Sequence, residues 1–295
     1  MTHIVLASVT LNAQETPFLT PINTAYGEIV SRKTYELILT DKDGVTAQSE
    51  CVSMDQAGYD EETLEDSYEA LNNVLIPEVI GQVLDITTIG ATLDSIITGN
   101  HYAKAALEMG VWALAAKKIG APLWTLLGAK TQVPRPLTQA IGIKSSAAKL
   151  KTSISDAINA GVKHIKLKIQ PGNDVGYIPN IHEMKTVDTK IWVDANGSYS
   201  SGDEALLKQL SHTGIDMIEQ PFSDMTTCAE LQNSLGIPIA LDESIRCLQD
   251  AIEMKNTGSG QVVILKPGRV GGFTESLRII DFCQDNGIDI YIGGM

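Results

Sequence analysis

The stretch His164-Ile165-Lys166-Leu167-Lys168-Ile169 decides the fold, together with Ile191-Trp192-Val193-Asp194-Ala195-Asn196. Side chains in a β-strand point alternately to opposite faces, so each stretch predicts a strand with one apolar face. Lys166 and Lys168 share the other face of the first strand, as Asp194 and Asn196 do in the second. Polar residues on matching faces indicate a site that both strands line.

Similar short β-rich runs recur from residue 137 onward, and helical stretches separate them. The seven runs are Leu137–Ile143, His164–Ile169, Ile191–Asn196, Met217–Pro221, Ile237–Asp242, Val262–Pro267 and Ile288–Gly293. Strands that alternate with amphipathic helices predict a parallel sheet whose strands are joined by crossover helices.

Five of these runs end near a charged residue, and the spacing of these residues is nearly constant. They are Lys168, Asp194, Glu219, Asp242 and Lys266, separated by 26, 25, 23 and 24 positions. Such spacing is typical of a βα repeat, and a (β/α)-barrel carries its active site at the C-terminal strand ends. An open doubly wound sheet is the alternative, but it would not need charged residues at five consecutive strand ends. We therefore predict an α/β protein with a (β/α)-barrel.

The repeat also predicts how the barrel ends. This fold needs eight strands, and one more repeat would put the eighth at about residue 315. The chain ends at Met295. We therefore expect a barrel that lacks strand eight, with an unpaired edge that favours a homo-oligomer.

The first 130 residues have a different pattern. The alternation of Lys33–Leu39 and the turn residues Asp41–Gly44 predict an antiparallel meander within residues 1–50. Apolar residues then repeat at three- and four-residue intervals up to residue 127, which predicts helices. Glycine and prolines between Gly128 and Pro136 mark a boundary. We predict an α+β domain over residues 1–130 and the barrel over residues 131–295.

Composition excludes several classes of protein. There are 36 acidic and 22 basic residues, and the formal charge of −14 argues against a nucleic acid partner. The most apolar helical stretch, residues 101–127, contains four charged residues, so no membrane partner is expected. The four cysteines show neither disulfide nor zinc-site spacing, which favours a reducing cytoplasm.

The charged strand ends also predict a chemistry. In an eight-strand barrel, Lys168 and Lys266 lie on opposite sides because their strands are four apart, with Asp194, Glu219 and Asp242 between them. Three converging carboxylates repel one another unless a cation neutralises them, and oxygen ligands suit Mg²⁺, with Mn²⁺ as a substitute. A metal flanked by two lysines suits removal of a proton next to a carboxylate. We therefore expect a small-molecule carboxylate as substrate.

Five motifs resemble the enolase superfamily, in its muconate-lactonizing subgroup. They are Lys166-Leu167-Lys168, Val193-Asp194-Ala195-Asn196, Ile218-Glu219-Gln220-Pro221, Leu241-Asp242-Glu243-Ser244 and Leu265-Lys266-Pro267-Gly268. Arg269, three residues after Lys266, makes the sequence similar to the branch of o-succinylbenzoate synthases and N-succinylamino acid racemases. The resemblance implies a modified TIM barrel with an N-terminal capping domain, in which loops near Pro17–Tyr26 and Cys51–Tyr59 close over the substrate.

The resemblance also implies a role for each site residue. Lys168 would take the proton, and Lys266 would stabilise the enediolate. The magnesium ligands would be Asp194, Glu219 and Asp242, surrounded by Lys166, Asn196, Glu243 and Arg269. The implied activity is o-succinylbenzoate synthase, which dehydrates 2-succinyl-6-hydroxy-2,4-cyclohexadiene-1-carboxylate in menaquinone biosynthesis. The alternatives are racemisation of N-acylamino acids by the same two lysines, and a non-catalytic remnant of the barrel.

Two features have simpler, structural explanations. Gly268–Gly272 lacks the Gly-Lys-Ser/Thr ending of a phosphate-binding loop, so we expect a structural loop. His164 shares the face of Lys166 but lies deeper in the barrel, which indicates a histidine of the core.

Overall fold

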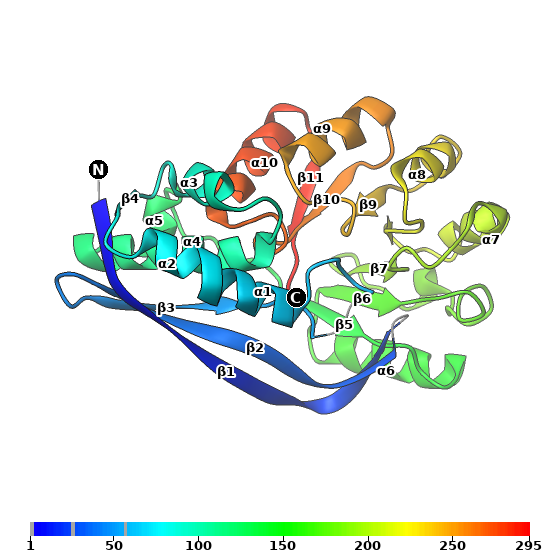
Figure 1. Ribbon diagram of the computed structural model, residues 1–295. Helices are drawn as coiled ribbons and strands as arrows, with labels where there is room; N and C mark the ends of the chain where they lie inside the picture. The colour runs from blue at the N-terminus through cyan, green and yellow to red at the C-terminus, as the bar shows by residue number, and fades with distance from the viewer. Residues whose placement is uncertain (1–2, 25–26, 56–57) are drawn as a thin grey trace.

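Two sheets organise the chain in the computed structural model, which describes residues 3–24, 27–55 and 58–295 (Figure 1). The N-terminal sheet has the order β3-β2-β1-β4. Its strands are β1 (His3–Thr24), β2 (Gly27–Asp41), β3 (Thr46–Cys51) and β4 (Val83–Asp85). Neighbouring strands pair antiparallel, which confirms the predicted meander.

Helices pack on this sheet around a central helix, α4. The helices are α1 (Leu64–Ala70), a π-helical segment (Leu71–Leu75), α2 (Ile76–Val79), α3 (Ile89–Ile96), α4 (His101–Ile119) and α5 (Leu123–Leu126). Helix α4 approaches β2 so closely that a Cβ atom at Gly110 would lie 2.4 Å from the Leu39 side chain. It ends at Gly120, which adopts the left-handed conformation that terminates many helices. Within the described ranges, no helix combines the length with the apolar character that a membrane span requires.

The second sheet is parallel, and its strands follow one another in chain order, β11-β10-β9-β8-β7-β6-β5. They are β5 (Thr138–Ile141), β6 (His164–Lys168), β7 (Lys190–Asp194), β8 (Ile218–Glu219), β9 (Ile239–Leu241), β10 (Val262–Leu265) and β11 (Asp289–Ile292). Each predicted run overlaps one of these strands, so the seven strands are confirmed. The sheet curls as part of a modified TIM barrel (Figure 1).

Helices cover the outer face of the curled sheet. They are α6 (Ala147–Asn159), α7 (Glu204–Ser211), α8 (Met225–Gln232), α9 (Leu248–Thr257) and α10 (Phe273–Asp285), with 3-10 turns at Ile181–Glu183 and Ser201–Asp203. Ile165, Leu167 and Val193 are buried against these helices, as the alternation predicts. A separate apolar cluster, which includes Trp192 and Ile264, fills the inner side of the sheet.

The connection from β6 to β7 differs from the predicted alternation of strands and helices. Residues 169–189 form an irregular segment whose only helical part is the 3-10 turn at Ile181–Glu183. Pro171 and Pro179 lack the backbone N–H that an α-helix needs, and Gly176 has a positive φ of 81°. The expectation of a crossover α-helix is wrong at this position.

Residues 17–24 belong to β1 and not to a loop. Strands β1 and β2 form a long hairpin in which Thr16 pairs with Arg32 and Ile22 pairs with Ile29. Pairing with β2 satisfies backbone groups on both sides of an irregularity between Pro17 and Ile22, where two prolines interrupt the ladder. The predicted loop near Pro17–Tyr26 is therefore wrong up to Thr24, and residues 25–26 lie outside the described residues.

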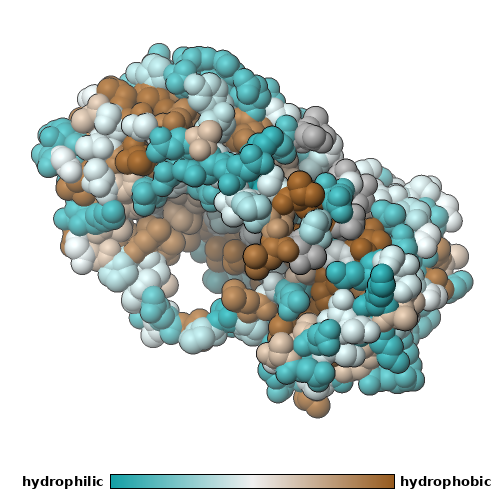
Figure 2. All heavy atoms as spheres, turned by 90° about the horizontal axis from the view of Figure 1, so that it is seen from below, coloured by the Kyte–Doolittle hydropathy of each residue, from teal (hydrophilic) through white to brown (hydrophobic). Residues whose placement is uncertain are grey.

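Figure 2, seen from below, shows the molecule hollowed between two lobes.

A buried carboxylate joins the N-terminal domain to the barrel. Glu108, in α4, is completely buried and accepts the backbone N–H groups of Phe273 (2.8 Å) and Thr274 (2.9 Å) at the start of α10. It also accepts the Thr274 hydroxyl (2.6 Å) and the Trp112 indole N–H (3.0 Å). The unpaired N–H groups and the dipole of a helix N-terminus stabilise a carboxylate.

The loop Gly268–Gly272 is structural, as the sequence predicts. A Cβ atom at Gly272 would lie 2.3 Å from the Glu108 carboxylate, and one at Gly268 would lie 2.9 Å from the Val52 side chain. These two glycines therefore allow the N-terminal domain to pack against the barrel.

We predict that Glu108→Ala lowers the free energy of unfolding by about 2–3 kcal/mol, because buried donors lose their acceptor. Urea unfolding followed by circular dichroism measures the change. Glu230→Gln, on an exposed position of α8, is the control and should unfold as the wild type does. Equal stability of the two variants would contradict a joining role for Glu108.

Candidate active site

The C-terminal ends of β6 to β10 bring together the nine side chains that the sequence predicts for the site. Lys166 and Lys168 lie on β6, Asp194 and Glu219 end β7 and β8, and Asn196, Asp242, Glu243, Lys266 and Arg269 follow β7, β9 and β10. The side chains of Asp194, Glu219 and Asp242 are completely buried. Buried carboxylates need partners of opposite charge, and the neighbouring lysines and arginine provide them.

Lys166 bridges two of the buried carboxylates. Its Nζ lies 2.9 Å from Asp194 Oδ2 and donates to Glu219 Oε1 at 2.8 Å. Lys168 donates to the same Asp194 oxygen at 2.7 Å and to Asn196 Oδ1 at 2.7 Å. The two lysines of β6 therefore both neutralise Asp194.

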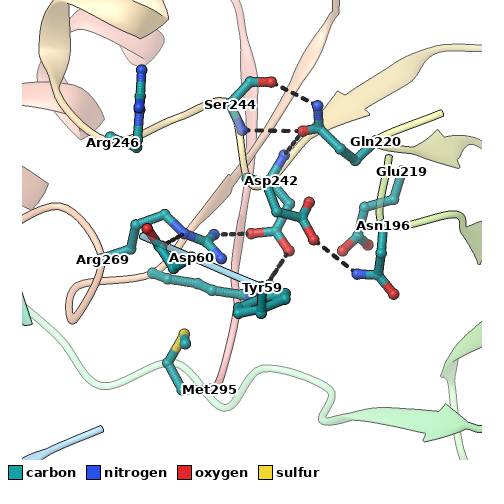
Figure 3. A network of polar contacts seen from close by, with 12 residues as sticks. Tyr59, Asp60, Asn196, Glu219, Gln220, Asp242, Ser244, Arg246, Arg269 and Met295 are labelled. Atoms are coloured by element: carbon teal, nitrogen blue, oxygen red, sulfur yellow. Dashed lines mark hydrogen bonds and ion pairs between the residues drawn. The ribbon is translucent and has the colours of Figure 1, made fainter. Parts of the chain in front are cut away.

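Lys266 and Arg269 neutralise the third carboxylate. Lys266 Nζ donates to Asp242 Oδ2 at 2.9 Å, and the Arg269 guanidinium donates to Asp242 Oδ1. Arg269 Nε also donates to Asp60 Oδ2 at 3.2 Å. Lys266 donates in addition to the Tyr59 hydroxyl. That hydroxyl donates to Asp242 at 3.4 Å (Figure 3). The segment between β3 and α1 therefore contributes Tyr59 and Asp60 to the site.

The three carboxylates differ in pKa because their surroundings differ. Burial, and after it the charge of Asp194, raise the pKa of Glu219 to about 8. Burial also opposes ionisation of Asp242 and Asp194, but adjacent cations outweigh it, so that the pKa of Asp242 falls to about 2 and that of Asp194 lies below its usual range. Burial would lower the pKa of Lys166, but the carboxylates around it raise that pKa well above 10.5. Glu219 is thus the carboxylate that the site's cations neutralise least.

The predicted convergence of the three carboxylates on one point is not found in this arrangement. Among residues 3–24, 27–55 and 58–295, no three His, Cys, Asp or Glu side chains are grouped so that they could hold a metal ion. The reason is that Lys166 bridges Asp194 and Glu219, while Asp242 pairs with Lys266 and Arg269.

The chemistry of these side chains nevertheless fits a hard divalent cation. Asp194, Glu219 and Asp242 lie at neighbouring strand ends and provide only oxygen atoms, which Mg²⁺ prefers as ligands. Asn196 donates to Glu243 Oε1 at 2.8 Å, whereas the buried Glu243 Oε2 accepts no hydrogen bond from any described residue. Asp194, Glu219 and Asp242 could hold the metal once the lysine side chains move away from these carboxylates.

A cleft of about 400 Å³ lies beside the site. It is lined by Gly58, Tyr59, Asp60, Glu61, Glu243 and Arg246. Tyr59, Asp60 and Glu243 belong both to this cleft and to the contacts described above. A ligand in the cleft would therefore touch residues of the site.

Gln220 organises the backbone after β8 and β9, although the sequence assigned it no role. Its Oε1 accepts the N–H groups of Asp242 (2.9 Å) and Ser244 (3.2 Å), and its Nε2 donates to the Ser244 hydroxyl at 2.6 Å (Figure 3). Gln220 and Asn196 have positive φ angles of 37° and 47°. This conformation costs energy in residues other than glycine and is concentrated at functional sites.

Trp192 and Asp60 are further contacts that sequence reasoning missed, whereas Tyr59 belongs to the predicted loop Cys51–Tyr59, of which residues 56–57 lie outside the described residues. Trp192 donates its indole N–H to Glu219 Oε2 at 2.8 Å. The alternation along β7 could have identified it, because Trp192 shares a strand face with Asp194. No local pattern connects Tyr59 and Asp60 with the barrel, because their contacts cross from one domain to the other.

Two family descriptions match the chain. Residues 6–128 match "Mandelate racemase / muconate lactonizing enzyme, N-terminal domain", and residues 149–295 match "Enolase C-terminal domain-like". The chain belongs to the enolase superfamily. The resemblance stated from the five motifs is thereby confirmed.

Relatives within the enolase superfamily include two kinds of enzyme. The chain is 36% identical over 278 residues to the o-succinylbenzoate synthase of Geobacillus stearothermophilus, a match that covers 93% of this chain and 73% of that protein. It is 33% identical over 289 residues to the N-succinylamino acid racemase of Thermus thermophilus, covering 97% and 77%. The solved structure of an enolase superfamily member from Listeria innocua matches with a TM-score of 0.92 at 31% identity, covering 99% of this chain and 79% of that one.

We predict that Lys166→Met destabilises the protein in EDTA by about 3–5 kcal/mol, because Asp194 and Glu219 stay buried without their shared cation. Urea unfolding in EDTA measures this loss. The control is Lys185→Met. Lys185 lies in the connection before β7 and forms an ion pair with Asp216, which this substitution removes. If the free energy of unfolding falls by the same small amount in both variants, Lys166 does not stabilise the buried carboxylates.

Proposed function

We propose that this chain is a Mg²⁺-dependent o-succinylbenzoate synthase, a lyase that dehydrates 2-succinyl-6-hydroxy-2,4-cyclohexadiene-1-carboxylate. The observation that carries the proposal is the arrangement of two lysines on either side of three buried carboxylates. Lys168 is on β6 and Lys266 follows β10, and these strands are four places apart in the sheet. Opposed lysines allow one to take a proton while the other stabilises the charge that develops.

In this reaction Lys168 removes the proton from the carbon next to the substrate carboxylate. The electron pair of that C–H bond first moves into the carboxylate group, which becomes an enediolate. The pair then returns to form a ring double bond as the neighbouring C–O bond breaks, and the hydroxyl group leaves as water with the proton that Lys168 returns. The Lys266 ammonium, on the other side, stabilises the negative charge of the enediolate. Mg²⁺ held by Asp194, Glu219 and Asp242 would supply further positive charge to the substrate carboxylate.

The remaining side chains would position these groups. Asn196 accepts a hydrogen bond from Lys168 and donates one to Glu243, which fixes the direction of the amide. Arg269 and Lys266 share the Asp242 carboxylate, so Arg269 also sets the charge around Lys266.

Racemisation of N-succinylamino acids is the second candidate, because two lysines four strands apart in the sheet also suit proton transfer on both faces of a substrate. In a racemase, Lys168 and Lys266 would take and return the proton on opposite faces of the substrate. The similarity to the Thermus thermophilus racemase supports this candidate.

The proposal includes a small carboxylate substrate, a role in menaquinone biosynthesis and a cytoplasmic location. Similarity to o-succinylbenzoate synthases supports the first two. The four cysteines, which are all free, support the third, because free thiols are typical of reducing compartments.

We predict that the chain converts the cyclohexadiene substrate with Mg²⁺ and that excess EDTA stops the reaction, as followed by ultraviolet absorbance. Lys168→Ala and Lys266→Ala should each lower kcat by about 10²–10⁴-fold, because each removes a group that handles the proton or its charge. Lys185→Met should keep the wild-type activity, since Lys185 pairs with Asp216 outside the site.

The same protein is then tested with an N-succinylamino acid in D₂O. Deuterium exchange with loss of optical activity, without dehydration of the first substrate, would favour the racemase. Neither activity in a chain that melts cooperatively would contradict both enzymes and favour a non-catalytic barrel.

A further inference from the structure

Trp192 makes a polar contact with a carboxylate of the site. Its Nε1 donates to Glu219 Oε2 at 2.8 Å, while Lys166 Nζ donates to Glu219 Oε1 at the same distance. The contact runs from β7 to the neighbouring strand β8, and both side chains are almost fully buried. One oxygen of Glu219 is therefore held by a charged donor and the other by a neutral donor.

Packing fixes the position of the Trp192 indole. Its ring lies 5.5 Å from that of Tyr291 on β11 and 6.1 Å from that of His164 on β6, measured between centroids. Strand β11 is four places from β7 in the sheet, so the contact with Tyr291 crosses the inner side of the curl. A ring held from two sides keeps its N–H directed at one point.

A neutral donor has an advantage next to a cation. The Lys166 ammonium would repel a divalent ion bound to Glu219, whereas the Trp192 indole can keep its hydrogen bond. Hydrogen-bond partners of metal-ligating side chains orient the ligand and raise metal affinity.

We propose that Trp192 is a positioning residue that orients Glu219 for Mg²⁺. This inference rests on the magnesium site of the proposed function. Trp192 lies two residues before Asp194 on the same face of the strand, and therefore deeper in the barrel.

The test compares Trp192→Phe with Trp112→Phe. Phenylalanine keeps an aromatic ring against Tyr291 and His164 but removes the N–H. Trp112 is the matched control, because its indole also donates to a buried carboxylate, that of Glu108, but in the N-terminal domain. Calorimetric titration with Mg²⁺ and electron paramagnetic resonance with Mn²⁺ should find about 10- to 100-fold weaker binding for Trp192→Phe and unchanged binding for Trp112→Phe.

A second measurement uses the wild-type chain and does not depend on the folding of Trp192→Phe. The three tryptophans give three indole N–H signals in nitrogen-15 NMR spectra, assigned with Trp112→Phe and Trp124→Phe. We expect Mg²⁺ to shift the Trp192 signal most. A Trp192 signal that does not move while Mg²⁺ binds would overturn the inference.

The outcomes separate this inference from the proposed function. If wild type and Trp192→Phe bind Mg²⁺ equally well, the role of Trp192 is refuted and the magnesium site stands. If the wild type binds neither Mg²⁺ nor Mn²⁺, the magnesium site of the proposed function fails, and the role of Trp192 fails with it.

Discussion

The burial of adjacent carboxylates is the constraint on which the site depends. Asp194, Glu219 and Asp242 are removed from water at neighbouring strand ends, where each negative charge makes the next one less favourable. Lysines from two strands and one arginine supply the opposite charge, and Trp192 supplies a neutral hydrogen bond. A curled parallel sheet can meet this requirement, because it brings the ends of successive strands to one edge.

The barrel strands and the main charged residues could be predicted from the sequence because their signals are local. Alternation along β6 and β7 assigns Lys166, Lys168 and Asp194 to one face, and regular spacing orders the strands. The loop before α10 was predicted correctly as structural for a chemical reason, the missing lysine and hydroxyl residue of a phosphate-binding loop. These inferences need only the geometry of one strand or one turn.

The parts that could not be predicted depend on contacts between distant segments. Tyr59 and Asp60 reach Lys266 and Arg269 from the other domain, and no periodic pattern in the sequence encodes such a contact. The β1–β2 hairpin exists because two strands satisfy each other's backbone groups, which a reading of residues 17–24 alone cannot reveal. The missing crossover helix after β6 has a local signal in Pro171 and Pro179, but the regular βα repeat on both sides predicts a helix there.

The contact between Glu108 and the start of α10 links two positions that are far apart in the chain. Any side chain larger than hydrogen at residue 272 would collide with the carboxylate, and loss of the carboxylate would leave buried donors without an acceptor. Each position therefore restricts which residues the other tolerates, so single changes at either site are disfavoured during evolution. A chimera that takes its N-terminal domain from one relative and its barrel from another would need a compatible pair at these two positions.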